Sequence, residues 1–424
     1  MPSLGTAPYS LVAVCRFWRA VGVATPRLWS YLTLDIDTEC PEGYYESMAA
    51  WLSRSGNCAL SLDFTFPNDD RTPADVQLHP VFQLAVRHSH RWEEVQIHSD
   101  FSEPSLHSFA CIKGKIPLLQ SLTVILAYEH NMRGGADGFV DAPRLRQYYL
   151  HDCESKMEVL KVPWGSLTKL NLQTFDGDDK SLLLLSQCRQ VVELEIMVCN
   201  PWGGNAMDID AARAIEFELP HLKSLTLESD DPISRLFLVL SAPALQHLHL
   251  TMCEYFQFDH WVAAENSSCY PLHLSKCRIT SLRLDLRKPV NGPKDLILCL
   301  NQTPHLEHLV LEGTAVSLLS SELLQRLAPD SPTQLLPKLQ TLTMDHIEDF
   351  PDALVAEILG QRLSSSSKGP SLLRSVVLKH CDTMTGVKSW RYRSSPLTLA
   401  CLRLHSQRGL DIRLLDFRGK RIKM

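Results

Sequence analysis

Residues 243–253 of the chain read PALQHLHLTMC. Counted from Leu245, apolar residues stand at +3 (Leu248) and +5 (Leu250), and Cys253 stands at +8. Leu248 and Leu250 alternate with histidine and threonine, and this period of two predicts a short strand with one apolar and one polar face. Such a strand cannot bury its apolar face alone, so the fold depends on whether the chain supplies neighbours of the same kind.

The same spacing recurs along the chain at intervals of 22 to 34 residues. Each repetition is weak on its own, but the set keeps the same three apolar positions. The series resembles the leucine-rich repeat, whose units span about 20 to 29 residues and stack side by side. The three positions are Trp92/Val95/Ile97, Leu119/Leu122/Val124, Leu145/Tyr148/Leu150, Leu167/Leu170/Leu172, Val191/Leu194/Ile196, Leu222/Leu225/Leu227, Leu245/Leu248/Leu250, Ile279/Leu282/Leu284, Leu306/Leu309/Leu311, Leu339/Leu342/Met344, Leu373/Val376/Leu378 and Leu399/Leu402/Leu404.

Helical segments fall between the predicted strands, at 180–188, 296–300, 320–327 and 352–359. Alternating strand, turn and helix predict an α/β fold. We expect a right-handed leucine-rich-repeat solenoid with a parallel sheet on its concave side and helices or irregular turns on its convex side. Cysteine takes the +8 position in four repeats, where we expect it to fill the turn after the strand: Cys153, Cys199, Cys253 and Cys381.

The polar face of this sheet is the expected binding surface. Positions +2, +4 and +6 of each strand belong to it, and they carry charges of both signs. Tyr149 and Arg283 are of the residue types enriched at the energetic centres of protein interfaces. We expect the face to bind a target protein through residues from the set Tyr149, His151, Asn171, Glu195, His249, Arg283, Asp285 and Glu312.

Before the repeats, residues 8–34 read PYSLVAVCRFWRAVGVATPRLWSYLTL. Apolar residues from Leu11 to Gly22 recur at intervals of three and four, which predicts one amphipathic helix. Thr25-Pro26 then ends this helix and begins a second short turn. A small helical cap on the end of a solenoid would show the same pattern.

The segments 14–19 and 25–29 resemble the second half of an F-box, as found in many fungal F-box proteins. Those proteins continue with a helix, a strand and degenerate leucine-rich repeats, and this chain has a predicted helix at 44–55 and a strand at 60–64 in that order. The opening Leu-Pro-x-Glu segment and first helix of an F-box have no match in residues 1–9, so the module is partial. Either the first helix has been lost or the true start lies upstream. By resemblance, the residues of the module's core or adaptor-facing surface are Leu11, Val14, Cys15, Trp18, Leu28 and Trp29.

This resemblance implies a substrate-recognition subunit of an SCF-type E3 ubiquitin ligase. The N-terminal module would bind a Skp-family adaptor within a cullin ligase complex, the repeats would bind an unknown target protein, and the chain would not itself be an enzyme. The alternative is a leucine-rich-repeat scaffold whose vestigial F-box no longer binds the adaptor. The expected organisation is a partial F-box at 1–34, a connecting helix and strand region with degenerate first repeats at 35–118, the solenoid at 119–405 and a basic tail at 406–424.

Length and composition suit a folded chain without a nucleic-acid or membrane role. Of the 424 residues, 45% are hydrophobic and 21% charged, and the net charge of −6 provides no basic field for nucleic acid. Arg16 and Arg19 interrupt the apolar run at 11–15, and no run reaches the roughly 18 residues of a membrane span. Thirteen unclustered cysteines indicate reduced thiols, so the expected location is cytoplasmic, nuclear or both.

No sequence motif predicts catalysis, and we expect no cofactor or metal. Glycine-rich phosphate loops, nucleophile elbows and zinc-protease motifs are absent from the sequence. Cys269, His273 and Cys277 lack a second ligand pair at a structural-zinc spacing, so we assign them to loop or core packing. His79 and its neighbours His88 and His90 are assigned to the surface.

Overall fold

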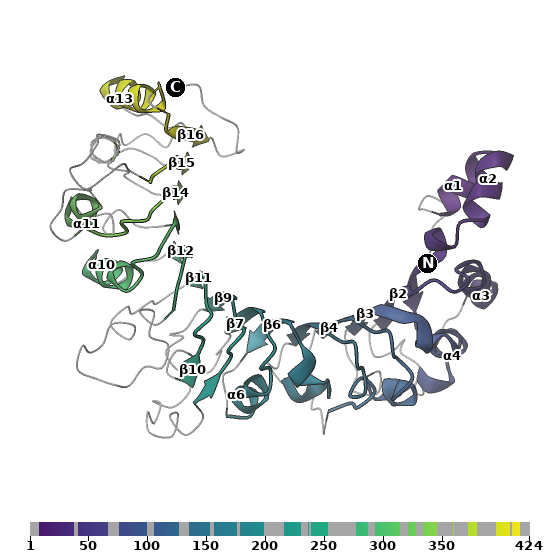
Figure 1. The fold of residues 1–424 in the computed structure, drawn as a ribbon. Coiled ribbons are helices and arrows are strands. Elements are labelled where there is room, and N and C mark those ends of the chain that lie inside the picture. The colour runs from purple at the N-terminus through teal and green to yellow at the C-terminus, as the bar shows by residue number, and fades with distance from the viewer. Residues whose placement is uncertain are drawn as a thin grey trace. The chain divides into compact units, whose positions relative to one another are not determined.

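The computed structural model shows an α/β fold built on one long parallel sheet (Figure 1). Its 14 strands follow one another in the order β1-β2-β3-β4-β5-β6-β7-β9-β11-β12-β13-β14-β15-β16. Parallel neighbours in chain order are what stacked strand–turn–helix units produce, so the predicted repeat architecture is confirmed at this level. The structure describes residues 8–37, 41–66, 76–99, 106–126, 135–152, 157–175, 179–198, 216–229, 236, 239–252, 277–286, 293–313, 321–327, 334–345, 359, 372–379, 396–407 and 409–415.

The chain forms two compact units, of which the first spans Met1–Val191. Three of its helices lie on one side of its strands, namely Tyr44–Arg54, Pro80–Arg87 and Asp179–Ser186 (Figure 1). The strands are β1 (Tyr31–Asp35), β2 (Leu60–Phe66), β3 (Trp92–Ser99), β4 (Ser121–Leu126), β5 (Gln147–Asp152) and β6 (Lys169–Phe175), and the α-helices are α1 (Tyr9–Val14), α2 (Arg16–Val23), α3 (Tyr44–Arg54), α4 (Pro80–Arg87) and α6 (Asp179–Ser186). Short 3-10 helices add η1 (Pro26–Trp29), η2 (Val76–Leu78), η3 (Ser89–Arg91), η4 (Ser108–Ile112), η5 (Met157–Val159) and η6 (Trp164–Ser166).

The second unit spans Val192–Met424 and repeats the arrangement. A two-stranded sheet of β8 and β10, which the sequence did not predict, accompanies the main sheet. The strands are β7 (Glu193–Val198), β8 (Phe217–Glu218), β9 (Ser224–Ser229), β10 (Leu240–Ser241), β11 (His247–Met252), β12 (Ser281–Leu286), β13 (His308–Glu312), β14 (Thr341–Asp345), β15 (Ser375–Lys379) and β16 (Asp411–Leu415), with helices α10 (Pro293–Asn301), α11 (Ser321–Arg326) and α13 (Pro396–Gln407).

The predicted apolar positions line up across the strands and form the core. In β11, Leu248 pairs in register with Leu225 of β9 and Leu282 of β12, and all three side chains are buried. Leu250 lies two residues further on the same face and is fully buried. Burying one leucine side chain contributes about 1.5 to 3 kcal/mol, so this ladder of leucines stabilises each strand against its neighbours.

The helix predicted from Leu11 to Gly22 is two helices, so that prediction is wrong. Cys15 adopts an extended backbone (φ −160°, ψ 173°) that ends α1, and its Sγ accepts a hydrogen bond from the backbone N–H of Trp18 at 3.5 Å. The thiol thus takes the N-cap position of α2 and satisfies one of the N–H groups that a helix start leaves unpaired. The break turns the chain between two short helices.

The last predicted strand, at Leu399/Leu402/Leu404, is also wrong because these residues lie in α13. In a strand, Leu402 and Leu404 would share one face, whereas in a helix they point about 200° apart. Accordingly Leu402 is 1% exposed and Leu404 is 46% exposed. The last strand is instead β16, within the segment predicted to be a tail.

Several predicted features lie outside the described residues. These are the four +8 cysteines, Cys269 and His273, and all of the predicted helix at 352–359 except Leu359. Cys277 is described and buried, and its Sγ donates to the Ala242 carbonyl at 3.3 Å, as core packing requires. No helix in the described part of the chain is long and apolar enough to cross a membrane.

Candidate interaction surfaces

Trp29 anchors the N-terminal helices to the first repeat. Its side chain is fully buried, and its indole Nε1 donates to the Gly22 carbonyl at 2.8 Å. Its ring lies edge-on to Trp51 of α3 with centroids 5.2 Å apart, and edge-on to Tyr9 of α1 at 5.9 Å. The Arg54 guanidinium lies 4.5 Å from the centroid of the same ring, a cation–π contact. One side chain thus joins α1, α2 and α3.

The two N-terminal helices are packed closely against each other. A Cβ added at Gly22 would come within 2.6 Å of Val12 Cγ1, so only glycine allows this approach without a shift of Val12. Arg19 Nε donates to the Val12 carbonyl at 3.0 Å, which ties α2 back to α1. The helix pair therefore has a defined geometry although neither helix exceeds eight residues.

The surface of this helix pair is strongly apolar. Seven apolar side chains are between 36% and 73% exposed, and Phe17 is the most exposed of them. Phe17, Trp18 and Val21 recur at intervals of three and four, so they share one face of α2. The others belong to the end of α1, the end of α2, η1 and the start of β1. We call this set the N-terminal surface: Val14, Phe17, Trp18, Val21, Val23, Leu28 and Tyr31.

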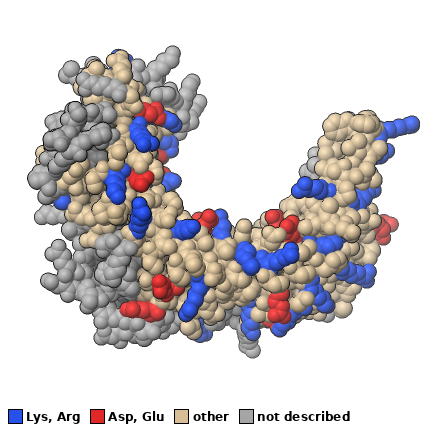
Figure 2. Space-filling view, in the orientation of Figure 1, with Lys and Arg blue, Asp and Glu red and all other residues tan. Residues whose placement is uncertain are grey.

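The charged side chains of the N-terminal segment are all positive. Residues 8–34 contain Arg16, Arg19 and Arg27 and neither Asp nor Glu. In Figure 2, the end of the molecule that α1 and α2 occupy in Figure 1 shows tan and blue side chains. A partner that covers this surface would match it with an apolar centre and an acidic rim.

The residues assigned by resemblance to the module divide into two groups in the structure. Trp29 is core. Val14, Cys15, Trp18 and Leu28 are exposed, and Leu11 is half-buried. Sequence reasoning did not single out Phe17, Val23 and Tyr31 as surface residues, although the interval of four from Phe17 to Val21 was a usable signal.

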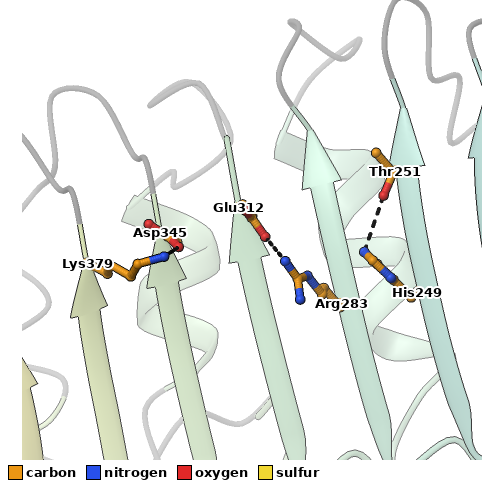
Figure 3. A network of polar contacts seen from close by, with 6 residues as sticks. All are labelled: His249, Thr251, Arg283, Glu312, Asp345 and Lys379. Atoms are coloured by element: carbon orange, nitrogen blue, oxygen red, sulfur yellow. Dashed lines mark hydrogen bonds and ion pairs between the residues drawn. The ribbon is translucent and has the colours of Figure 1, made fainter. Parts of the chain in front are cut away.

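On the sheet, the polar face of the second unit carries a network of charged pairs (Figure 3). The Arg283 guanidinium on β12 forms an ion pair with the Glu312 carboxylate on β13. Further along, Lys379 Nζ on β15 lies 2.6 Å from Asp345 Oδ2 on β14. In β-sheet register, Asp285, Glu312 and Asp345 stand side by side on adjacent strands. The two cations offset the repulsion that three adjacent carboxylates would otherwise create.

His249 lies at the edge of this network. Its Nε2 is 3.2 Å from Thr251 Oγ1, and it pairs in register with Arg283. Burial lowers the pKa of His249, and the Arg283 guanidinium lowers it further, against the carboxylates of Glu312 and Asp285, which raise it. Neutral imidazole is therefore favoured here, with Nε2 able to accept a hydrogen bond from the Thr251 hydroxyl.

The predicted target-binding residues are shared between the two units. In the first unit, Tyr149 pairs in register with Asn171 on the half-buried polar face, and His151 lies further along β5. In the second unit, Glu195 is exposed on β7, while Asp285 is buried at 3% exposure. Within the first unit, the structure brings Tyr149 and Asn171 together. Within the second unit, it brings His249, Arg283 and Glu312 together (Figure 3).

The described residues hold no group of three His, Cys, Asp or Glu side chains placed to bind a metal ion. Burial raises the pKa of the Cys188 and Cys299 thiols to about 12, and that of Cys277 to about 11. A thiol with such a pKa is a poor nucleophile at neutral pH. These three cysteines serve as core side chains.

Comparison of the sequence with models of known protein families finds no match, and comparison with curated proteins finds none either.

Proposed function

We propose that the chain is the substrate-recognition subunit of an SCF-type E3 ubiquitin ligase, with the N-terminal surface docking a Skp-family adaptor. The sheet of a leucine-rich-repeat solenoid would bind the target protein. In this proposal the chain performs no chemistry, because the cullin complex supplies catalysis.

The exposure of the N-terminal surface carries the proposal. A terminal cap of a solenoid normally has a polar outer face, because it ends the stack and meets water. Here the outer face presents Phe17, Trp18 and Val21 instead, and contiguous exposed apolar patches mark protein-binding sites. The F-box resemblance of the same residues suggests which partner covers them.

The vestigial-module alternative has one observation in its favour. Trp29 fixes the helix pair onto α3 through buried aromatic contacts, as a structural cap requires. That anchoring is also what a docking module needs to hold its partner in a fixed place. Binding to the adaptor decides between the two functions.

The experiment measures binding of the purified full chain to a recombinant Skp-family adaptor by isothermal titration calorimetry. The double variant Phe17→Asp/Trp18→Asp should weaken binding by about a hundredfold or more, because two central aromatic anchors are lost. Leu183→Asp is the matched control, since Leu183 of α6 is an exposed apolar residue away from the N-terminal surface. The control should bind like the native chain. No binding by the native chain, or equal binding by the double variant, contradicts the proposal.

For the target, the proposal rests on the charged network of the second unit. Cross-strand pairs such as Arg283–Glu312 hold charged groups in fixed positions before binding, which reduces the entropy lost on association. Arg283 is about half exposed, so a partner can reach its guanidinium. We expect Arg283→Ala to weaken target binding while leaving adaptor affinity unchanged.

A further inference from the structure

A pocket of about 520 Å³ lies in the first unit, between the end of α4 and the turn after η4. Arg87, Ser89 and His90 line one part of it. Lys115 and Gly114, from the segment that follows η4, line another. Its volume lies within the range of about 300 to 1,000 Å³ that small-ligand sites occupy. The pocket has no role in the proposed function, which uses the N-terminal surface and the sheet.

Cations concentrate around this pocket. The segment 87–91 reads RHSHR, and Lys115 adds a further charge from a separate turn. Gly114 adopts a left-handed conformation (φ 71°) in that turn, and Lys115 Nζ is held by the Cys111 carbonyl at 2.9 Å. Three basic side chains from two segments therefore line one hollow: Arg87, His90 and Lys115.

The dipole of α4 accounts for only one of these basic residues. A cation in the last turn of a helix is favoured by the helix dipole, and Arg87 occupies that position. Lys115 does not belong to α4, and Arg91 lies beyond its cap, buried at 6% exposure. Arg91 donates to Ser55 Oγ at 2.6 Å and to the Cys58 carbonyl at 2.9 Å, so its guanidinium is engaged outside the pocket lining.

Carboxylates of the described residues do not neutralise the pocket. Arg87, His90 and Lys115 take part in no ion pair within the described part of the chain, whereas the neighbouring Lys113 pairs with Asp137 at 2.7 Å. The next acid along the chain, Glu93, accepts a hydrogen bond from Gln120 Nε2 at 2.8 Å.

The positive charges of this segment also act on the neighbouring His88. Burial lowers its pKa first, and the charges of Arg91, His90 and Arg87 lower it further. A bound anion would relieve this repulsion.

We propose that the pocket binds a phosphate monoester, with the phosphate dianion against Arg87, His90 and Lys115 and its organic group against Val86 and Pro117. Arginine and lysine are the side chains that phosphate oxygens pair with most strongly, and the two apolar residues also line the pocket. A free phosphorylated metabolite and a phosphorylated side chain of a partner protein present this same chemistry.

The test titrates the full chain with O-phosphoserine and with a phosphoserine heptapeptide, using the unphosphorylated heptapeptide as a blank. Calorimetry should detect binding of the phosphorylated ligands and none of the blank. The double variant Arg87→Gln/Lys115→Gln should bind about tenfold to a hundredfold more weakly, because two charge-assisted contacts are lost. Lys113→Gln, two residues away and engaged by Asp137, is the matched control and should bind like the native chain.

Binding of both phosphorylated ligands, or of O-phosphoserine alone, supports a site for free phosphate monoesters. Binding of the peptide alone supports a phosphorylated protein as the source. The proposal is overturned if neither ligand binds, or if the double variant binds as the native chain does. Because Arg87 and Lys115 lie outside the N-terminal surface, adaptor binding by the double variant stays native-like whichever result is obtained.

Discussion

Two tryptophans eleven residues apart perform different tasks. Trp29 is fully buried, whereas Trp18 is 48% exposed. Trp29→Ala should destabilise the N-terminal helices by about 3 to 5 kcal/mol, because it leaves a large cavity and removes the bond to Gly22. Trp18→Ala should change stability by about 0.5 kcal/mol or less. Hydrogen-exchange protection of α2 and β1 measures the difference, and equal loss in both variants would contradict the assigned roles.

Histidine 79, assigned to the surface from sequence, is buried at 7% exposure. Its Nε2 lies 3.2 Å from the Asp37 carbonyl, and its Nδ1 has no hydrogen-bond partner among the described residues. Burial lowers its pKa below the ordinary 6.5, against the Asp37 carbonyl and carboxylate, which raise it. No local sequence pattern indicates this burial, because His79 packs against a segment 42 residues earlier in the chain, just after β1.

This pKa shift predicts a dependence of stability on pH. Between its lowered folded pKa and pH 6.5, His79 is mostly protonated in the unfolded chain and mostly neutral in the folded chain. Its contribution to stability is therefore full above about pH 6.5 and is lost as pH decreases towards the folded pKa. His79→Gln keeps a donor for the Asp37 carbonyl but cannot titrate. Thermal unfolding between pH 5 and 8 should show a smaller acid loss in this variant than in the native chain. An identical loss would contradict the prediction.

Among the elements, α13 shows where leucine spacing misleads. The pattern L-x-x-L-x-L places three leucines on one face of a strand, yet its first two leucines also match one face of a helix. Pro396 begins α13, and proline is favoured at the first position of a helix. The segment from Leu399 to Leu404 is therefore helical and not a strand. The ten repeats from Leu119 to Leu373, together with the segment at Trp92, contain strands as predicted, because each has a neighbouring strand in register.

Alanine substitutions test the assignment of α13. Leu402→Ala should cost about 2 to 5 kcal/mol, because Leu402 is buried, whereas Leu404→Ala should cost little. Hydrogen exchange in α13 and β16 reports the local free energy of unfolding in both variants. Similar losses for the two substitutions would indicate that both leucines face the core, as a strand requires.

The N-terminal helices show what sequence periodicity leaves open. Intervals of three and four identify apolar positions on a helix, but they do not say whether those positions face the core or water. Exposure of Val14 and Trp18 follows from the break at Cys15 and from the use of Trp29 as the anchor. The anchoring of Trp29 depends on its contact with Trp51 of α3, which lies beyond any local sequence pattern.

At the scale of the whole molecule, stability comes from contacts between neighbouring repeats. Each repeat contacts mainly the repeats before and after it, so a defect in one should remain local. Leu250→Ala, at a fully buried position, should cost about 2 to 5 kcal/mol and increase hydrogen exchange in β9, β11 and β12 while leaving β2 and β3 unchanged. His249→Ala is the control on the opposite face of the same strand. An increase throughout the sheet would contradict this local coupling.

The central claim is that the N-terminal surface binds a Skp-family adaptor. Hydrogen–deuterium exchange of the full chain, with and without the purified adaptor, tests it most directly. Addition of the adaptor should slow exchange in α1, α2 and η1, where Phe17 and Trp18 lie, and leave β7 to β16 unchanged. Unchanged exchange at α1 and α2 in the presence of saturating adaptor, or protection confined to the sheet, would contradict the claim.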